Sequence, residues 1–174
     1  MLKIDAYDLA AYVKSQRGGP LLTIMDEVRD FVFIKDLEGR FLFSNRAHLA
    51  HLGRPESQVL GKNDFDLFPH RLAEAFYTAE THLFETRIPV VRLQESMDSH
   101  GTKFYSTAIK MLVCDKHDNA LGLIGTVHRI AMDSSLDVEQ SKAHVMSILR
   151  SQPGITPSQL KAFEATLPSV IVKK

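Results

Sequence analysis

Residues 31–45 contain two short apolar runs, rich in aromatic and β-branched residues, separated by a four-residue turn. Residues of these types favour strands, and the glycine that ends the turn supplies the positive φ of a tight loop, so the stretch predicts a β-hairpin. Alternate residues of a strand point to opposite faces of its sheet, and all of the first run, FVFI, is apolar. Both faces of the hairpin must therefore be covered, which places it at the centre of a sheet with helices packed against it.

Apolar spacing elsewhere in the chain predicts the remaining elements. Helical spacing predicts helices over residues 2–16, 47–52, 71–86, 133–150 and 156–166, with single helical turns near 55–60 and 64–68. Runs of strand-forming residues predict strands at about 90–97, 103–114 and 121–130. Asn45 is placed to cap the helix that ends at Gly53. We expect Phe65 and Phe68 to face inward, and residues 21–27 to form a short lead-in to the hairpin.

The first predicted helix carries a narrow apolar stripe. The stripe consists of Leu2, Ala6, Leu9 and Val13, and the segment Arg17-Gly18-Gly19-Pro20 ends the helix. Such a stripe can seat a helix on the sheet or pair it with a second copy of the chain, and the pattern leaves both alternatives open.

The order of elements is strand, strand, several helices and then three strands with short connections. Short connections join antiparallel neighbours. The sequence therefore predicts an α+β fold, in which a five-stranded antiparallel sheet carries a helical flap on one face. We expect an N-terminal amphipathic helix over residues 1–20, a core domain over 21–132 and a helical C-terminal extension over 133–174.

Charge and cysteine content narrow the class of protein. The chain has 21 basic and 21 acidic residues, and this balance argues against a dedicated nucleic-acid binder. A single cysteine, Cys114, permits no internal disulfide and fits a reducing compartment. No window is apolar over the length needed to span a bilayer. We therefore expect a soluble, cytoplasmic protein that does not bind membranes.

Several linked stretches of the chain resemble a known family. They are Phe31–Arg40, Asn45–Ala47 with Leu52-Gly53, Gly61–Pro69, Glu85–Val90, Lys110 ahead of Asp115, and Gly122–Gly125. In this order and at this spacing they resemble the PAS sensory domain, in the form common in bacterial signalling proteins, over residues 24–131. The resemblance implies a sensor, and its strand order agrees with the one derived above.

The chain departs from the family pattern at three places. Arg129-Ile130-Ala131 stands where such domains commonly carry an Asp-Ile-Thr relay to a downstream module. Leu112 replaces a usual Pro, and Arg87 replaces a usual Gly. These departures concern how the domain couples to a downstream module, and they leave the expected fold unchanged.

The resemblance raises the question of a cofactor. Haem-binding relatives place an axial His near Phe76, whereas His70 and His82 point to other faces of the helix, so haem is disfavoured. Covalent flavin is disfavoured because the chain lacks the Asn-Cys-Arg motif of blue-light relatives, while non-covalent flavin stays open. His48 and His51 have a spacing that can share a metal, but no local third ligand is present. We expect two half-exposed helix residues and no metal.

A small-molecule pocket between the sheet and the long helix is the remaining option. The strand over 103–113 presents Phe104, Ser106, Ala108 and Lys110 on one face, and Tyr105, Thr107, Ile109 and Met111 on the other. Hydrophobicity alone would turn the second set inward. The resemblance implies instead that the first set lines the cavity, because its small residues leave room for a ligand.

Lys110 would then be a buried cation. A buried cation requires a partner, which a small anionic ligand would provide, with Arg92 and Gln94 contributing from the neighbouring strand. The alternative is that Lys110 extends to solvent and that the interior is simply filled. The candidate ligand-binding residues are Phe76, Arg92, Gln94, Phe104, Ser106, Ala108, Lys110 and Gly125.

No catalytic motif appears in the sequence. The paired acids Asp36/Glu38 and Asp64/Asp66 lie in turns, where Asp caps and bends the backbone, so we do not expect an enzyme. The sequence predicts a signalling module that binds a small ligand or a partner protein and reports through its terminal helices to a downstream protein, as a homodimer.

Two alternative functions stay open. Residues 144–163 resemble the first two helices of a helix-turn-helix DNA reader, which would make the chain a transcriptional regulator, although residues 167–174 are too short for a recognition helix. The other alternative is a structural dimerisation domain with a filled core.

Overall fold

The computed structural model describes residues 1–101 and 103–130 and, beyond them, residues 143, 146, 147, 150, 156–158, 160, 161 and 164. The helices are α1 (Leu9–Ser15), α2 (Pro20–Glu27), α3 (Arg46–Leu52), α4 (Glu56–Val59), α5 (Asp64–Leu67) and α6 (His70–Thr86). The strands are β1 (Leu2–Lys3), β2 (Phe31–Lys35), β3 (Phe41–Ser44), β4 (Val90–Met97), β5 (Lys103–Cys114) and β6 (Ala120–Arg129). The predicted helices over 133–150 and 156–166 fall largely outside the described residues.

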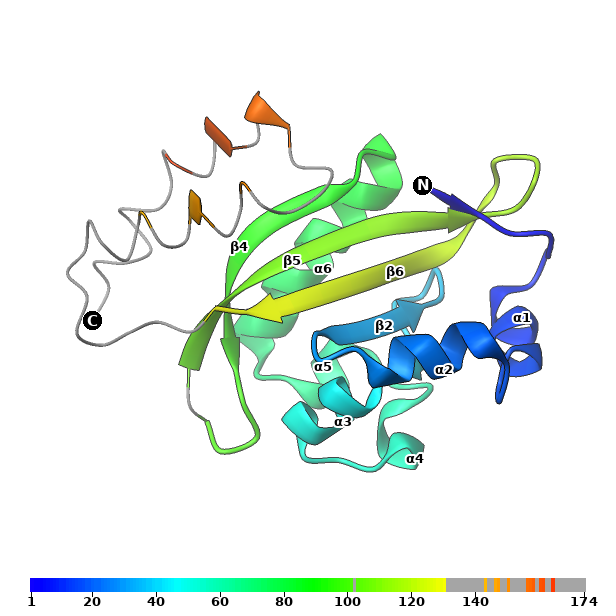
Figure 1. Ribbon diagram of the computed structural model, residues 1–174, viewed down its shortest axis with the longest axis horizontal. Helices are drawn as coiled ribbons and strands as arrows, with labels where there is room; N and C mark the ends of the chain where they lie inside the picture. The colour runs from blue at the N-terminus through cyan, green and yellow to red at the C-terminus, as the bar shows by residue number, and fades with distance from the viewer. Residues whose placement is uncertain are drawn as a thin grey trace.

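The strands form one twisted sheet (Figure 1). β2 pairs with β3 and β6, β6 pairs with β5, and β5 pairs with β4, and all of these pairings are antiparallel. The predicted α+β fold with its five antiparallel strands is therefore confirmed. β1 adds a short sixth strand that runs parallel to the end of β5, where Leu2 lies opposite Val113.

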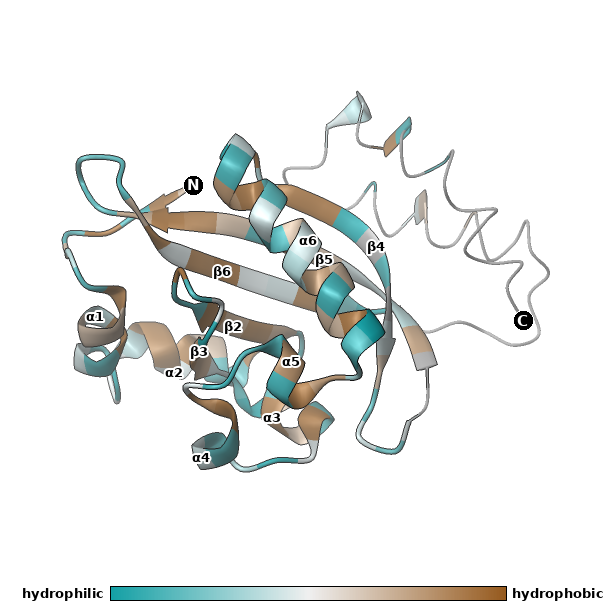
Figure 2. Ribbon diagram, turned by 180° about the vertical axis from the view of Figure 1, so that it is seen from behind, coloured by the Kyte–Doolittle hydropathy of each residue, from teal (hydrophilic) through white to brown (hydrophobic). Residues whose placement is uncertain are grey.

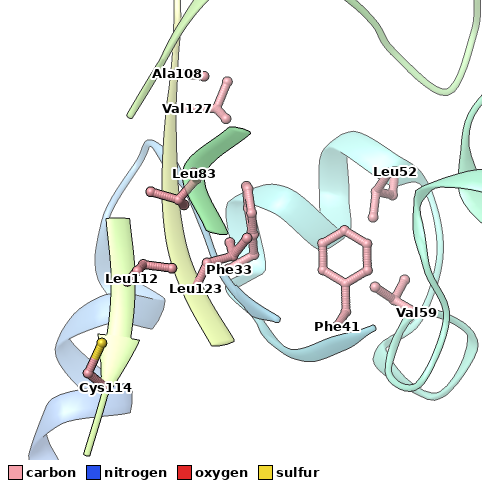
Figure 3. Close-up of a cluster of buried hydrophobic side chains, with 10 residues drawn as sticks. All are labelled: Phe33, Phe41, Leu52, Val59, Leu83, Ala108, Leu112, Cys114, Leu123 and Val127. Atoms are coloured by element: carbon pink, nitrogen blue, oxygen red, sulfur yellow. The ribbon is translucent and has the colours of Figure 1, made fainter. Parts of the chain in front are cut away.

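Helices cover both faces of the sheet. On one face α3 lies against β2, and α6 lies across β4 and β5, as Figure 2 shows. The apolar core on this side includes Phe33, Phe41 and Leu83 (Figure 3). On the opposite face, α1 contributes Leu9 to a second cluster around Val32. The hairpin is thus covered on both sides, as its two apolar faces predict.

The N-terminal segment differs from the single helix predicted over residues 2–16. Its first residues pair with β5 as β1, and α1 begins only at Leu9, where the Asp8 carboxylate accepts a backbone N–H of the first turn. A strand of two residues is too short to show an alternating pattern, which is why the sequence did not reveal it. The predicted lead-in over 21–27 is helix α2, because Pro20 both ends the preceding segment and suits the first helical position.

Helix α5 turns a charged residue, and not an aromatic one, into the core. Its N-cap is Asn63, which forms a capping box with Asp66. This register leaves Asp64 only 6% exposed and Phe65 45% exposed, so the prediction that Phe65 faces inward is wrong. Phe68 packs partly buried against the core, as predicted.

Asn45 joins α3 to the connection between α2 and β2. Its side-chain oxygen accepts one backbone N–H of β2 and one of α3, so its predicted role as the N-cap of α3 is confirmed. Its side-chain nitrogen donates to the backbone carbonyl oxygens of Met25, Val28 and Asp30. Asn45 is fully buried, and the hydrogen bonds that it accepts from the Val32 and His48 N–H groups are buried with it, so its amide replaces water there.

We expect the Asn45→Ala substitution to lower the free energy of unfolding by about 3 kcal/mol, because it leaves several buried backbone groups without partners. The matched change Asn63→Ala, at the more exposed N-cap of α5, should cost about 1 kcal/mol. Urea denaturation of both variants measures the two losses. Equal losses would show that the additional hydrogen bonds of Asn45 do not stabilise the fold.

Candidate functional site

A cavity of about 40 Å³ lies between the sheet and helices α3, α5 and α6. Its aromatic walls are Phe31, Phe33, Phe41, Phe68, Phe76, His48 and His51. Its other walls are Asp64, Gln94, Ser96, Lys110 and Val127. A cavity of this size has room for about three water molecules. A few polar groups among aromatic walls are typical of a site for a small molecule.

Four buried charged side chains meet beside the cavity. Lys35 of β2 donates hydrogen bonds to Asp64 of α5 at 2.5 Å and to Glu80 of α6 at 2.8 Å. Lys110 of β5 donates to the same Oε1 atom of Glu80 at 2.5 Å. None of the four residues is more than 6% exposed. Their two positive and two negative formal charges cancel, and the cluster ties two strands to two helices.

Aromatic rings surround both ammonium groups of this cluster. Lys35 Nζ lies 4.6 Å from the ring centre of Phe41, and Lys110 Nζ lies 5.6 Å from that of Phe76. Both ammonium groups also lie within 6 Å of the Phe33 ring centre, at 5.4 and 5.9 Å. The attraction of a cation to an aromatic face offsets part of the hydration that each ammonium loses on burial.

Burial and the neighbouring charges shift the pKa values of the four groups in different directions. Burial lowers the pKa of Lys35, but attraction to Asp64 and Glu80 outweighs it, so the pKa lies above its ordinary value. Burial raises the pKa of Glu80, but the two lysines outweigh it, so this pKa is lowered. For the two members that line the cavity, desolvation prevails: it raises the pKa of Asp64 and lowers that of Lys110. The short Lys35–Asp64 contact nevertheless indicates an ion pair, so we take all four groups as charged.

His48 and His51 line the cavity as neutral rings. His48 Nδ1 shares a hydrogen bond of 2.7 Å with Ser44 Oγ. Burial, followed by repulsion from His51 and Lys35, lowers the pKa of His48 to about 3. Burial also lowers the pKa of His51, whose ring stacks on Phe31 with centres 4.5 Å apart. The expectation of a half-exposed side chain holds for His51 but is wrong for His48, which is 4% exposed.

Strand β4 adds two polar residues to the cavity wall. Ser96 Oγ shares a hydrogen bond of 2.9 Å with Ser106 Oγ. Gln94 is 7% exposed, and its Oε1 has no hydrogen-bond partner within the described part of the chain. Buried polar atoms are almost always paired, so this unpaired oxygen is an exception. It is free to accept a hydrogen bond from a bound molecule.

The structure brings most of the predicted ligand-binding residues to this cavity. Three of them line it, namely Phe76, Gln94 and Lys110. Four others support its walls: Phe104 meets the ring of His51 edge-on, Ser106 bonds Ser96, Ala108 lies in the core, and Gly125 leaves space for the Phe33 ring. Arg92 instead donates to the carbonyl oxygen of Ala75 on α6. A binding role for these residues stays a prediction.

Lys110 does not extend to solvent. It is 3% exposed, so the alternative of a side chain reaching water is wrong. Its partner is a carboxylate of the protein, Glu80, and the cation is therefore balanced without a ligand.

Sequence reasoning missed three members of the charged cluster. Lys35 stands at the end of an apolar strand, and Glu80 lies within the apolar stripe of α6. A charge inside an apolar pattern is a usable signal of a buried ion pair. Asp64 gave no such signal, because an acid at the start of a short helix is ordinary.

Other site types receive no support from the structure. Among the described residues, no three His, Cys, Asp or Glu side chains are placed to hold a metal ion. Every helix in the described ranges is too short or too polar to cross a membrane. Cys114 is a free thiol buried in the core.

We expect the Glu80→Gln substitution to lower the free energy of unfolding by about 3–5 kcal/mol, because it removes the carboxylate that two buried ammonium groups share. The matched control is Glu85→Gln on the exposed side of the same helix, which should change stability by less than about 0.5 kcal/mol. Chemical denaturation measures both. Equal stability of the two variants would contradict a structural role for the charged cluster.

His48 should make stability depend on pH. Its pKa is about 3 in the folded protein and 6.5 when exposed, so the unfolded chain takes up a proton first as the pH falls. The free energy of unfolding should therefore decrease from about pH 6.5 towards pH 3, by up to about 1.4 kcal/mol per pH unit. The His48→Phe variant should show a flatter profile, whereas His82→Phe, at an exposed position of α6, should keep the parent slope. Parallel profiles for all three proteins would contradict the assignment.

Comparison with known proteins agrees with this fold. Residues 25–134 match the family model described as the PAS fold. A diguanylate cyclase of Vibrio cholerae is 28% identical over 104 residues, which make up 59% of this chain and 32% of the cyclase. The chain thus spans about a third of the length of that relative.

Two solved structures illustrate the likeness of the fold. The PAS domain of BvgS from Bordetella pertussis superposes with a TM-score of 0.59 at 20% identity, covering 76% of this chain and 98% of that domain. VqmA of Vibrio cholerae, solved with ligand and DNA, gives a TM-score of 0.56 at 16% identity, covering 86% of this chain and 78% of VqmA. Because the family model covers more than half of the sequence, and the sheet and helices agree with it, this chain belongs to the PAS-fold family.

Proposed function

We propose that this PAS sensory module binds a small molecule in the cavity between its sheet and helices, and that its terminal segments pass the binding event to a partner. Support comes first from the cavity itself, in which aromatic rings and a few buried polar groups enclose about 40 Å³. A purely structural domain gains stability by filling such a space, since cavities destabilise a core. The cavity therefore supports ligand binding over a dimerisation domain with a filled core.

The contacts around the cavity provide a route to the chain ends. A molecule that shifts α6 relative to β5 must change the contact between Glu80 and Lys110. β5 pairs with β1 at the N-terminus, and it also holds the end of β6, where the Ile130 N–H donates to the Tyr105 carbonyl at 3.0 Å. Occupancy of the cavity is thus connected through β5 to both ends of the sensory domain.

The surface of α2 supports assembly as a homodimer. Leu21, Ile24 and Val28 are 45%, 66% and 41% exposed, and their spacing places them on one side of the helix. An exposed apolar stripe of this kind is typical of an interaction surface. VqmA, whose fold is similar, is described as a dimer. A downstream signalling protein is the alternative occupant of this surface.

A second candidate function is transcriptional regulation. VqmA is described as binding target DNA, and this chain is similar to it in fold. The predicted helix-turn-helix tail falls largely outside the described residues, and the balanced charge of the chain argues against a DNA-binding surface. Retention of the protein on DNA at moderate salt would favour this second function.

A cavity-filling substitution tests the proposed function. We expect Val127→Phe to abolish binding of molecules of a few heavy atoms, because the larger side chain occupies the cavity that Val127 lines. Thr126→Phe, on the opposite face of the same strand, should bind them as the parent protein does. Saturation-transfer NMR with a panel of small amides, alcohols and carboxylates of three to five heavy atoms measures binding, and thermal unfolding confirms that both variants fold. Absence of binding by every member of the panel, or unchanged binding to Val127→Phe, would contradict the proposal.

A further inference from the structure

The size of the cavity limits its ligand to a few atoms. About 40 Å³ has room for about three water molecules, so a single molecule that fills it has about three heavy atoms, for example one polar atom and two carbons. The chemistry of the walls then determines which polar group such a molecule carries.

The amide of Gln94 requires a hydrogen-bond donor. This side chain is more than nine-tenths buried, lines the cavity, and has an Oε1 atom without a hydrogen-bond partner in the described ranges. Strand pairing sets its position, because Gln94 lies opposite Ser106 of β5, and Ser96 lines the cavity from the same face of β4. An unpaired buried oxygen costs free energy, which an N–H or O–H group of the ligand recovers.

The ion pairs beside the cavity favour a ligand without charge. Lys110 and Asp64 line the cavity, but each already has an oppositely charged partner, in Glu80 and Lys35 respectively. A charged ligand would bring an unpaired charge into this buried space, or would have to break one of these ion pairs. Simple amines are cations at neutral pH and carboxylic acids are anions, so the donors that remain neutral are hydroxyl compounds and amides.

The aromatic walls decide between a hydroxyl compound and an amide. The phenylalanine rings that line the cavity are Phe31, Phe33, Phe41, Phe68 and Phe76. The amide of matching size, formamide, is polar throughout and has no apolar part to contact these rings. The alcohol of matching size, ethanol, has two carbons that gain free energy when they leave water for the rings. Its hydroxyl group carries the donor that Gln94 requires.

We infer that the cavity recognises a short-chain alcohol, whose hydroxyl group donates a hydrogen bond to Gln94 Oε1 while its carbons contact the phenylalanine rings. The inference rests on the proposed function and adds the ligand class to it. Water competes for the same space, but it lacks the apolar part that the rings favour. The ion pairs around the cavity act in selection by excluding charged compounds of the same size.

Four molecules of equal heavy-atom count test the inference. Ethanol has the donor and the apolar part, acetonitrile lacks the donor, ethylammonium carries a charge, and formamide lacks the apolar part. We expect the parent protein to bind ethanol about tenfold more tightly than acetonitrile, the usual effect of one lost buried hydrogen bond. Ethylammonium should bind at least about tenfold more weakly than ethanol, since its charge finds no free partner. Formamide should bind at least about fourfold more weakly, the effect of one methylene group that is not buried.

Protein-detected NMR titration gives the four dissociation constants. This method suits the expected affinities, because a ligand of so few atoms binds no more tightly than about 1 mM.

The Gln94→Met variant tests the assigned residue. It keeps the length of the side chain but removes the amide, so the preference for ethanol over acetonitrile should disappear. Gln58→Met, at an exposed position of α4, should keep the preference. If Gln94→Met does not fold, the side-chain carbonyl carbon signal of Gln94 in the parent protein serves instead, and it should shift with ethanol but not with acetonitrile.

The outcomes separate this inference from the proposed function. Equal binding of ethanol and acetonitrile, or tighter binding of ethylammonium or formamide, would overturn the ligand class while leaving the cavity as a binding site. An unmoved Gln94 carbonyl signal at saturating ethanol would overturn the assigned contact. Failure of ethanol to bind overturns the inference, and failure of the whole panel used with Val127→Phe overturns the proposed function as well.

Discussion

The arrangement of sheet and helices around the cavity depends on one buried ionic contact, the carboxylate of Glu80 between the ammonium groups of Lys35 and Lys110. The three residues come from α6, β2 and β5. An apolar contact tolerates sliding, because dispersion and the hydrophobic effect have little directional preference. A short hydrogen bond between buried charges does not tolerate sliding, since a small displacement leaves a charge unpaired in a medium of low dielectric constant. The position of α6 over the sheet is therefore fixed more narrowly than packing alone would fix it.

Asn45 has the corresponding role at the other end of the hairpin. Its amide fixes the start of α3 relative to the connection that leads into β2. α3 carries His48 and His51, so the same residue also sets the position of two cavity walls. The cavity is thus bounded by elements that polar contacts hold in place, which allows a space to persist among side chains that would otherwise collapse into it.

The strands were the most predictable part of this fold. β4 and β5 have the predicted limits, because long alternating or apolar runs between clear turns leave little choice of register. β1 and α2 were not predicted, since two residues carry no period and Pro20 was interpreted only as a breaker. At the site, family resemblance placed Lys110 and Gln94 at the cavity. The pairing of Lys110 with Glu80 could not be predicted from the sequence, because contacts between residues far apart in the chain depend on how helices cross a sheet.

This pairing changes how the buried lysine should be interpreted. From the sequence, a lone buried cation suggests an anionic ligand, because something must balance the charge. In the structure the protein supplies the balancing carboxylates itself, so the ion pairs hold the elements together and the buried lysine needs no anionic ligand. Lys35 and Glu80 lie behind the cavity, whereas Gln94 lies in its wall. The ion pairs that fix the helices are therefore separate from the polar wall of the cavity. A molecule bound in the cavity, as proposed above, would act on elements whose relative positions the ionic cluster fixes, so a small displacement there would be carried by rigid elements to the ends of β5 and β6.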